Sequence, residues 1–451
     1  MGGEFELATA TLLAGERGLT EPEKKEIVAR IGAAMQRQGL PYIGSPHNMF
    51  TPYFRYYEDV GAHVEVAMTP SVSPFELVRR EGQAFKLVRR ALERVRMREP
   101  GLVLAKNNKC YVSGFETWSA HESYGVYRDF RLLKKALLPF LVTRQCLCGN
   151  GGLVNRRFWL SQRAEFISEV ANSNTTFGRP LFGLRNEPLM QNSRLKYRWH
   201  NITGCSLMSE TGEALRFGTT QLVLFAAQED ATLGGAVKFE DPVASYKKLS
   251  ETAPDGLHII DPHLIRVQRH YLHATGRWLE KSENAPPWCA RIWKLWSSLL
   301  DMLEEDPMLC STILDPYIKM RLYSEFLRQR GKRWQDLEYN QDLYWELALM
   351  DFRYHSLADG LFDELEAAGA LNHRLFSDAE TEPGNEPEPY VVEAPPRERA
   401  RARLIKQYSG QRHVDMCWGA ILDSSAGRHA PLEDPFSEKV VWKDLKRPSA
   451  S

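Results

Sequence analysis

The chain has 451 residues, of which 43% are hydrophobic, enough for one large domain with an appendage or for two or three small domains. Lys and Arg total 58 and Asp and Glu total 58, so the charge balance gives no reason to expect nucleic acid or an anionic membrane as a partner. The longest apolar runs are too short to span a bilayer, and the first residues lack the basic and apolar segments of a signal peptide.

The first predicted strand carries acidic residues on one face. Side chains alternate between the two faces of a strand, so the segment from Gly3 to Leu7 places Glu4 and Glu6 on the same side. Farther on, Thr20-Glu21-Pro22-Glu23 has the pattern of a capping box with proline in the first helical turn. An amphipathic helix is therefore expected from Glu21 to about Gln38.

The central strand is predicted over residues 55–65. Alternation would place a cation, a phenol, carboxylates and an imidazole on one face, from Arg55, Tyr57, Asp59, His63 and Glu65. The opposite face is mostly apolar, and a glycine at position 61 leaves room for a bulge. A half-buried edge strand with a wet outer face would show the same pattern. The carboxylates of the first strand favour a metal site over a simple edge strand, because two strands would then offer ligands to a divalent metal ion.

The rest of the chain is predicted to alternate strands and helices. A second helix is expected from Ser73 to about Arg96, with strands at 102–105 and around 119–127. Apolar periodicity predicts helices in much of 131–170, 211–228, 262–282, 290–306, 315–330 and 340–369. Residues 381–394 are rich in Pro and Glu and are expected to be a linker. The expected division is a catalytic domain at 1–380 and a small C-terminal domain at 395–451, with a basic helix and a strand over 416–422 that dock on the main domain.

The polar residues suggest a metal and nucleotide site. Glu4, Glu6, Glu65 and His121 form a donor set that suits Mg²⁺ or Mn²⁺ bridging nucleotide phosphates. The sequence lacks a glycine-rich phosphate loop, so arginines would have to hold the phosphates of ATP. The candidates are Arg55, Arg163, Arg179, Arg185 and Arg198. A lone arginine is more often a surface residue.

The remaining aromatic, histidine and cysteine residues receive a weak functional assignment or none. Trp418 could stack on an adenine ring, although a tryptophan in a strand is usually a core residue. His200, His263 and His355 are isolated in the sequence and receive no chemical role. The seven irregularly spaced cysteines are expected to be free, mostly buried thiols in a reducing cytoplasm.

Short sequence motifs along nearly the whole chain resemble the Pup ligase and Pup deamidase family, which attaches or removes the prokaryotic ubiquitin-like protein Pup. The matching motifs are Gly3-Glu4-Phe5-Glu6, Arg55-Xaa-Tyr57-Xaa-Asp59-Val60-Gly61-Ala62-His63-Xaa-Glu65, Lys106-Asn107-Asn108, Ala120-His121-Glu122-Ser123-Tyr124, Ser161-Gln162-Arg163-Ala164-Glu165, Arg185-Asn186-Glu187-Pro188, Met208-Ser209-Glu210 and Asp434-Pro435-Phe436. They occur in the order of the family.

The resemblance implies an α+β, glutamine-synthetase-like fold, in which helices back a curved, mainly antiparallel sheet that forms a cradle. It also implies Mg²⁺ and ATP as cofactors, and a ligase reaction in which a glutamate γ-carboxylate is phosphorylated and captured by an amine. Carried over by motif, Glu4, Tyr57 and Glu65 would bind magnesium, and Glu6 and His121 are further candidates. Arg55 would contact ATP, and Trp418 would line the nucleotide site. Asp59 would be the general base.

Departures from the family pattern leave the partner open. Met68 and Pro70 replace a threonine and a glutamate of the family, and Asn186 replaces an aspartate. A Pup-like protein or a smaller glutamate-bearing molecule are both candidate donors, and nothing indicates the oligomeric state. The alternatives are a deamidase or depupylase, a small-molecule γ-glutamyl ligase, and an ATP-binding interaction protein without catalysis. The short connection between Glu6 and Asp59 favours a ligase, because the deamidases carry a long insertion there.

Overall fold

The computed structural model describes residues 1–11, 18–186, 196–253, 255, 259–384 and 394–445. The strands in chain order are β1 (Gly2–Thr11), β2 (Ile43–Ser45), β3 (Asn48–Phe50), β4 (Phe54–Asp59), β5 (His63–Met68), β6 (Leu102–Ala105), β7 (Ala120–Val126), β8 (Gly152–Val154), β9 (Arg157–Trp159), β10 (Ile167–Asn172), β11 (Arg179–Gly183), β12 (Tyr197–Asn201), β13 (Val414–Cys417), β14 (Ala420–Asp423), β15 (Arg428–Pro431) and β16 (Lys443–Asp444).

The helices are α1 (Glu21–Gln36), α2 (Pro74–Arg96), α3 (Phe130–Thr143), α4 (Gln145–Cys148), α5 (Glu210–Glu229), α6 (Pro242–Ser250), α7 (Pro262–Lys281), α8 (Pro287–Glu305), α9 (Asp315–Gln329), α10 (Gln341–Tyr354), α11 (Leu361–Ala367) and α13 (Pro396–Tyr408). Within the described residues, no helix is both long and apolar enough to cross a membrane.

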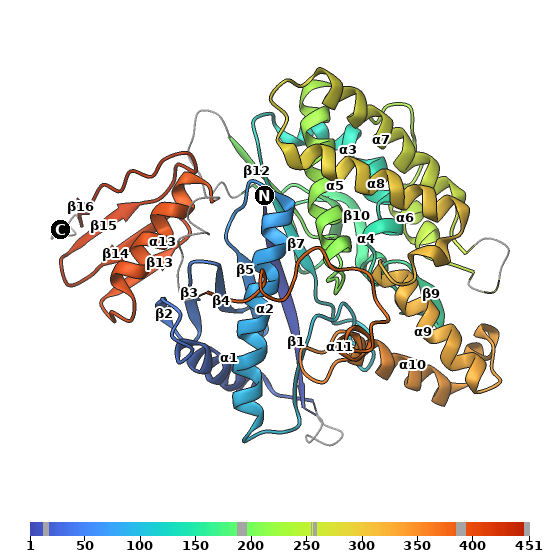
Figure 1. The fold of residues 1–451 in the computed structure, drawn as a ribbon, viewed down its shortest axis with the longest axis horizontal. Coiled ribbons are helices and arrows are strands. Elements are labelled where there is room, and N and C mark those ends of the chain that lie inside the picture. Colours follow the sequence, from blue (N-terminus) through green and yellow to red (C-terminus); the bar gives the residue numbers. More distant parts are fainter. Residues whose placement is uncertain (12–17, 187–195, 254, 256–258, 385–393, 446–451) are drawn as a thin grey trace.

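The main sheet has the strand order β12-β7-β1-β5-β4-β3-β2, with β6 paired to the second half of β1. Its neighbouring strands are antiparallel, whereas the separate β10–β11 pair is parallel. Phe5 and Val64 are buried beneath α1 and α2, which lie across one face of the sheet (Figure 1). Because side chains alternate, Glu4, Glu6 and Glu65 point to the opposite face.

Two of the predicted single strands are hairpins. The segment expected to be one strand over 55–65 is β4 and β5, joined by a turn in which Ala62 N–H donates to Asp59 O at 2.9 Å. Gly61 has φ +85° and Ala62 φ +58°, values that end a strand. Residues 416–422 likewise divide into β13 and β14. The prediction of one strand is wrong in both cases, because the turn residues interrupt the extended backbone.

The N-terminal helices match the sequence prediction closely. The capping box at the start of α1 is confirmed, with Thr20 N–H donating to Glu23 Oε2 at 2.8 Å. Helix α1 buries Ile27, Val28 and Ile31 against α2 and the sheet. The predicted helices over 262–282, 290–306 and 315–330 correspond to α7, α8 and α9.

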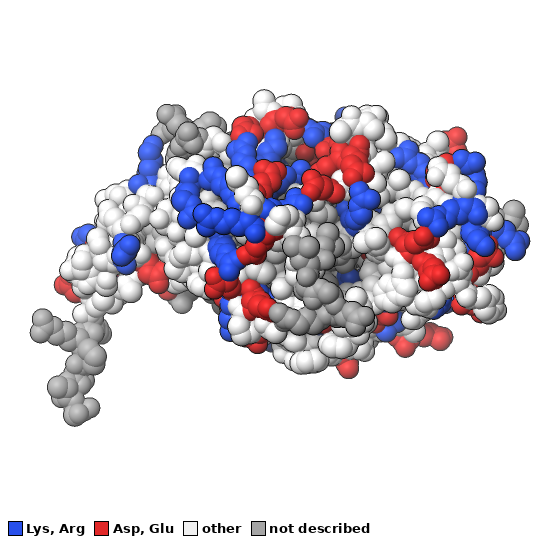
Figure 2. All heavy atoms as spheres, turned by 90° about the horizontal axis from the view of Figure 1, so that it is seen from below, with Lys and Arg blue, Asp and Glu red and all other residues white. Residues whose placement is uncertain are grey.

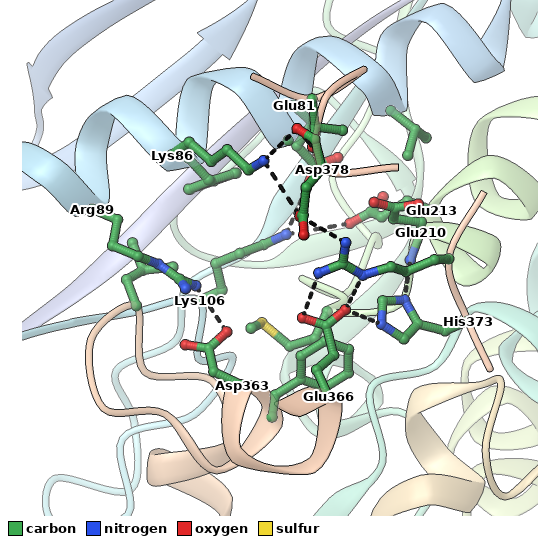
Figure 3. Close-up of a pocket in the computed structure, with 18 residues that line it drawn as sticks. Glu81, Lys86, Arg89, Lys106, Glu210, Glu213, Asp363, Glu366, His373 and Asp378 are labelled. Atoms are coloured by element: carbon green, nitrogen blue, oxygen red, sulfur yellow. Dashed lines mark hydrogen bonds and ion pairs between the residues drawn. The ribbon is translucent and has the colours of Figure 1, made fainter. Parts of the chain in front are cut away.

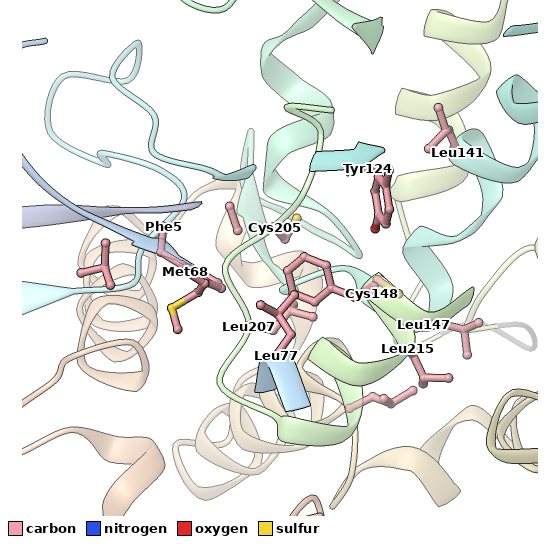
Figure 4. Close-up of a cluster of buried hydrophobic side chains, with 14 of the residues drawn as sticks. Phe5, Met68, Leu77, Tyr124, Leu141, Leu147, Cys148, Cys205, Leu207 and Leu215 are labelled. Atoms are coloured by element: carbon pink, nitrogen blue, oxygen red, sulfur yellow. The ribbon is translucent and has the colours of Figure 1, made fainter. Parts of the chain in front are cut away.

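A helical layer adjoins the sheet on the side of β7 and β12 (Figure 1). Leu77 of α2 and Leu215 of α5 belong to the same buried cluster as Phe5 and Met68 of the sheet (Figure 4). The helical prediction over 131–170 is wrong beyond Cys148, where the chain forms β8, β9 and β10. Glycines cause the break, since Gly152 has φ +144° and a Cβ there would approach the Gln162 side chain to 2.5 Å.

The C-terminal residues form their own small sheet of β13–β16 with α13 beside it (Figure 1). The predicted docking is confirmed, because Ile43 of β2 and Phe50 of β3 share a buried cluster with Ile405, Met416 and Ile421. Of the predicted linker, residues 385–393 lie outside the described residues. The cysteines of the described residues are free thiols, and most are buried, as expected.

Candidate active site

A cavity of about 450 Å³ opens on the face of the main sheet that α1 and α2 do not cover. It brings together every residue that the sequence singled out for the site: Glu4, Glu6, Arg55, Tyr57, Asp59, Glu65, His121, Arg185, Arg198 and Trp418. The strands explain this convergence, since Glu4 pairs with His121 and Tyr57 pairs with Glu65 across neighbouring strands. Glu187 and Pro188 of the Arg185 motif lie outside the described residues.

One half of the cavity holds a carboxylate cluster of Glu6, Asp59 and Glu65, whose oxygens lie within 4.8 Å of one another. Glu6 is fixed by the Ser119 backbone N–H, which donates to its Oε2 at 2.7 Å. Burial, and then the charges of Glu4, Glu6 and Asp59, raises the pKa of Glu65 well above its usual range. A bound cation would relieve this repulsion, and the oxygen donor set fits Mg²⁺.

Tyr57 lies beside this cluster and is half-buried. Burial raises the pKa of its phenol far above the ordinary value, and the charges of Glu65 and Glu4 raise it further. The phenol is therefore protonated, and Tyr57 lies directly opposite Glu65 across the β4–β5 pair. Direct metal ligation by Tyr57 stays a prediction.

The other half of the cavity holds Glu4, His121 and His200, which offer ligand atoms within 4.8 Å of one another. His121 Nδ1 is 3.5 Å from Glu4 Oε2. Burial lowers the pKa of His200 to about 3, against the opposing charge of Glu4, so this imidazole is neutral. Burial alone would raise the pKa of Glu4, but the hydrogen bond with His121 and the charge of Arg198 lower it.

His200 is the main site residue that the sequence did not reveal. The available signal was local: Arg198 and His200 lie two positions apart, the spacing of side chains that share one face of a strand. The structure places them on β12 and buries Trp199 on the other face. What the sequence could not show is that β12 pairs with β7, which brings His200 beside His121 with ring centroids 5.1 Å apart. Thr117, Thr175 and Thr176 also line the cavity and were not predicted.

Arginines surround the carboxylates. Arg55 is held by Asn48, to whose Oδ1 its Nε donates at 2.9 Å, and its guanidinium lies 4.1 Å from the Tyr57 ring centre. Arg163 donates to Thr117 Oγ1 and to a backbone carbonyl, and burial lowers its pKa to about 10. The adjacent Arg179 also lines the cavity. Carboxylates beside arginines match what a metal–triphosphate complex requires.

A second, largely apolar cavity of about 270 Å³ adjoins the first and shares Glu4, Arg198 and Trp418 with it. Met68 and Pro70, two of the departures from the family pattern, line this cavity. Trp418 comes from the turn between β13 and β14, so the C-terminal sheet contributes to the site. Its ring packs on Phe50 at 5.2 Å and on the guanidinium of Arg401 at 5.0 Å.

A charged cavity of about 220 Å³ lies elsewhere, between α2 and residues 361–381 (Figure 3). Its charges are paired with each other: Arg89 contacts Asp363 at 3.0 Å, and Lys106 contacts Glu81. Positive and negative side chains are likewise interspersed over the surface in Figure 2. Lys106 lies 4.9 Å from the Phe5 ring, on the face of the sheet that α2 covers, so this cavity is separate from the candidate site.

Comparisons with known proteins agree with this geometry. The family model described as Pup-ligase protein matches residues 20–422. The Pup–protein ligase of Corynebacterium diphtheriae is 32% identical over 356 residues, 74% of this chain and 72% of that protein. The Pup–protein ligase of Micrococcus luteus is 30% identical over 422 residues, 86% of each chain.

Solved structures match over most of the chain as well. The structure of the complex between Pup and its ligase PafA has a TM-score of 0.74 and 25% identity, and covers 100% of this chain and 89% of that one. The structure of the Pup ligase PafA with ADP has a TM-score of 0.71 and 25% identity, and covers 95% and 94%.

Fold and site together define a mixed α+β protein of the glutamine-synthetase-like class, with a sheet whose open face carries the polar cleft. Within that class, the chain belongs to the Pup ligase family. The family resemblance seen in the sequence is confirmed, and so is the expectation of an ATP-dependent ligase that forms carbon–nitrogen bonds.

Proposed function

We propose that this chain activates the γ-carboxylate of a glutamate with Mg²⁺–ATP and joins it to an amine, with a Pup-like protein as the glutamate donor and a protein lysine as the acceptor. The observation that carries the proposal is one continuous site. A charged cavity with carboxylates and arginines meets an apolar cavity at Glu4, Arg198 and Trp418.

The two cavities suggest how the nucleotide lies. The apolar cavity suits an adenine ring, with Trp418 at its border as a stacking surface. The triphosphate would then extend past Arg198 toward Arg55 and Arg185 in the charged cavity. Mg²⁺ held by Glu4, Glu6 and Glu65 would neutralise charge on the phosphates and on the incoming carboxylate.

The chemistry requires two transfers in the same cleft. A γ-carboxylate oxygen of the donor attacks the γ-phosphorus of ATP, ADP leaves, and an acyl phosphate forms. The amine then attacks the carbonyl carbon, phosphate leaves, and an amide bond remains. A lysine amine is protonated at neutral pH, so Asp59 is proposed to take its proton before the attack.

Two observations support synthesis and Pup as the donor. Residues 18–53, between the first and central strands, fold into α1, β2 and β3, without room for a long inserted loop. The PafA structure that covers the whole chain was solved as a complex with Pup. The division into domains at 1–380 and 395–451 stays a prediction, as does the linker between them.

The test supplies the purified protein with Mg²⁺–ATP and two substrate sets in parallel. One set contains a Pup-like protein that ends in glutamate and a lysine-bearing acceptor. The other contains the glutamine-ending form and a preformed conjugate. Formation of ADP, phosphate and a new isopeptide bond in the first set is expected. Hydrolysis in the second set without ligation in the first would contradict the ligase direction, and nucleotide binding without turnover in either would favour the interaction-protein alternative.

A further inference from the structure

Exposed apolar residues lie on loops that border the Asp59 end of the charged cavity. Val60 is in the turn between β4 and β5, Phe115 in the loop between β6 and β7, and Phe177 in the loop between β10 and β11. These three residues, here called the apolar rim, are 81%, 75% and 83% exposed. A single exposed apolar side chain is ordinary, but several from separate loops around one opening are typical of an interaction surface.

Each member of the apolar rim lies at or next to the wall of the cavity. Val60 lines the cavity directly. Thr117, two positions after Phe115, also lines it, and so does Thr176, the residue before Phe177. None of these three lining residues borders the apolar cavity proposed for adenine. The apolar rim therefore lies at the end of the cleft away from the proposed adenine pocket.

The two phenylalanines are carried by loops whose backbone is hydrogen-bonded in place. In the first loop, Cys110 N–H donates to Glu116 O at 3.0 Å and closes the backbone around the phenylalanine between them. In the second loop, Asn172 Nδ2 donates to Gly178 O at 2.6 Å and does the same. A partner that covers these side chains therefore does not have to order the loops first, which lowers the entropic cost of binding.

The length of a lysine side chain indicates which partner covers the apolar rim. Asp59 is proposed to take the proton of the acceptor amine, and Val60 is the next residue in the chain. A lysine carries its amine on a four-carbon stem, which spans about 6 Å when extended. A folded protein whose lysine reaches Asp59 must therefore bring its own surface against the exposed Val60.

The glutamate donor has a different approach to the cleft. A glutamate at the end of a chain can enter on an extended tail, which spans about 3.3 Å per residue. A few residues of tail therefore keep the body of the donor away from the opening. The acceptor lysine projects from a folded surface, so the acceptor is the partner that has to pack against the opening itself.

We propose that Val60, Phe115 and Phe177 form a docking surface for the acceptor protein, and that burial of this apolar rim supplies affinity that a free amine cannot obtain. The partner is a folded protein with apolar side chains beside an exposed lysine. The inference rests on the proposed function, because it takes Asp59 as the place where the amine loses its proton.

The test compares two amine acceptors in ligation with Mg²⁺–ATP and a saturating Pup-like donor that ends in glutamate. One acceptor is a folded protein whose ligated lysine has been located by mass spectrometry. The other is Nα-acetyl-lysine methylamide, which is too small to cover the apolar rim. In Phe115→Ser and in Phe177→Ser, kcat/KM for the protein should fall roughly 5- to 30-fold, the loss expected when a large apolar contact is truncated. The value for the small amine should be unchanged.

The matched control is Met97→Ser. Met97 is as exposed as the apolar rim but follows α2, which covers the opposite face of the main sheet. This variant should keep the wild-type kinetics with both acceptors. Equal losses with both acceptors in the rim variants would indicate a structural effect and overturn the docking surface. A rise in the KM for the donor, with the protein acceptor unaffected, would assign the rim to the donor and overturn it as well.

The same assay separates this inference from the proposed function. Ligation of neither amine by the wild type would refute the proposed function and the docking surface with it. Ligation of both amines, without a loss for the protein acceptor in the rim variants, would overturn the docking surface alone. Ligation of the small amine but of no folded protein would likewise overturn the docking surface and leave the ATP-dependent ligation intact.

Discussion

Replacing Asp59 by Asn removes the proposed general base while keeping the shape of the side chain. At pH 7 a lysine amine with a pKa near 10.4 is neutral in only about one molecule in 2,500. If Asp59 supplies the deprotonation step, amide formation should fall by about 10³-fold at pH 7, within the ~10²–10⁴-fold range of general base catalysis. Asp59 lies among the proposed metal ligands, but Glu6 and Glu65 remain in the variant, so ATP binding should persist.

The pH dependence makes this prediction specific. Without the base, the rate depends on amine that has lost its proton in solution, so it should rise about tenfold per pH unit up to the pKa of lysine. The assay is single-turnover isopeptide formation between pH 6 and 10, with nucleotide affinity measured separately. The control is Glu58→Gln, because Glu58 lies next in the strand but contacts His47 at 2.9 Å, outside the cavity. A loss below tenfold at pH 7, or a pH profile parallel to that of the wild type, would refute the assignment.

Three further predictions concern metal binding by Glu65, stacking of Trp418 on adenine, and the stability of the fold in acid. Glu65→Gln should abolish the rise in melting temperature that Mg²⁺–ATP produces. The melting temperature without metal should be no lower than that of the wild type, because burial and neighbouring carboxylates already oppose ionisation of Glu65. A rise with Mg²⁺–ATP that persists in the variant would contradict the role of Glu65 in metal binding. Trp418→Ala should cost about 1–3 kcal/mol of stacking and raise the KM for ATP roughly 5- to 150-fold, whereas Trp442→Ala, in the same small sheet unit but outside both cavities, should not. Burial opposes ionisation of Glu366, but hydrogen bonds from His373 and Arg374 outweigh it and lower the pKa of Glu366 to about 2. Its contribution to the free energy of unfolding should therefore be complete above the ordinary value of 4.5 and decline as the pH falls from there toward 2; Glu366→Gln should flatten that decline, and an unchanged acid denaturation curve would contradict it.

The face assignment of the central segment was predictable even though its secondary structure was not. The hairpin pairs Tyr57 with Glu65 and Asp59 with His63, and directly opposite residues share a face. In this register, odd-numbered residues of β4 lie opposite odd-numbered residues of β5. Counting alternate residues along one continuous strand therefore assigns these side chains to the same face as the hairpin does. Only the turn at Gly61, where φ is positive, was not apparent from the period.

Contacts between distant segments were beyond the sequence pattern. His200 joins the site only because β12 pairs with β7 and β7 pairs with β1. Trp418 reaches the proposed nucleotide pocket only because the C-terminal sheet packs on β2 and β3. Motif resemblance supplied Trp418 in advance, whereas a lone histidine outside the quoted motifs had no comparable signal.

The central claim is that the donor carboxylate is activated by phosphoryl transfer from ATP, and oxygen-isotope transfer tests it most directly. The donor glutamate carries ¹⁸O in its γ-carboxylate, and the phosphate released during ligation is analysed by mass spectrometry. One ¹⁸O atom in each phosphate is expected, because the oxygen that attacks the γ-phosphorus leaves with it when the amine attacks. Ligation that releases unlabelled phosphate would contradict the acyl phosphate and the account of the site built on it.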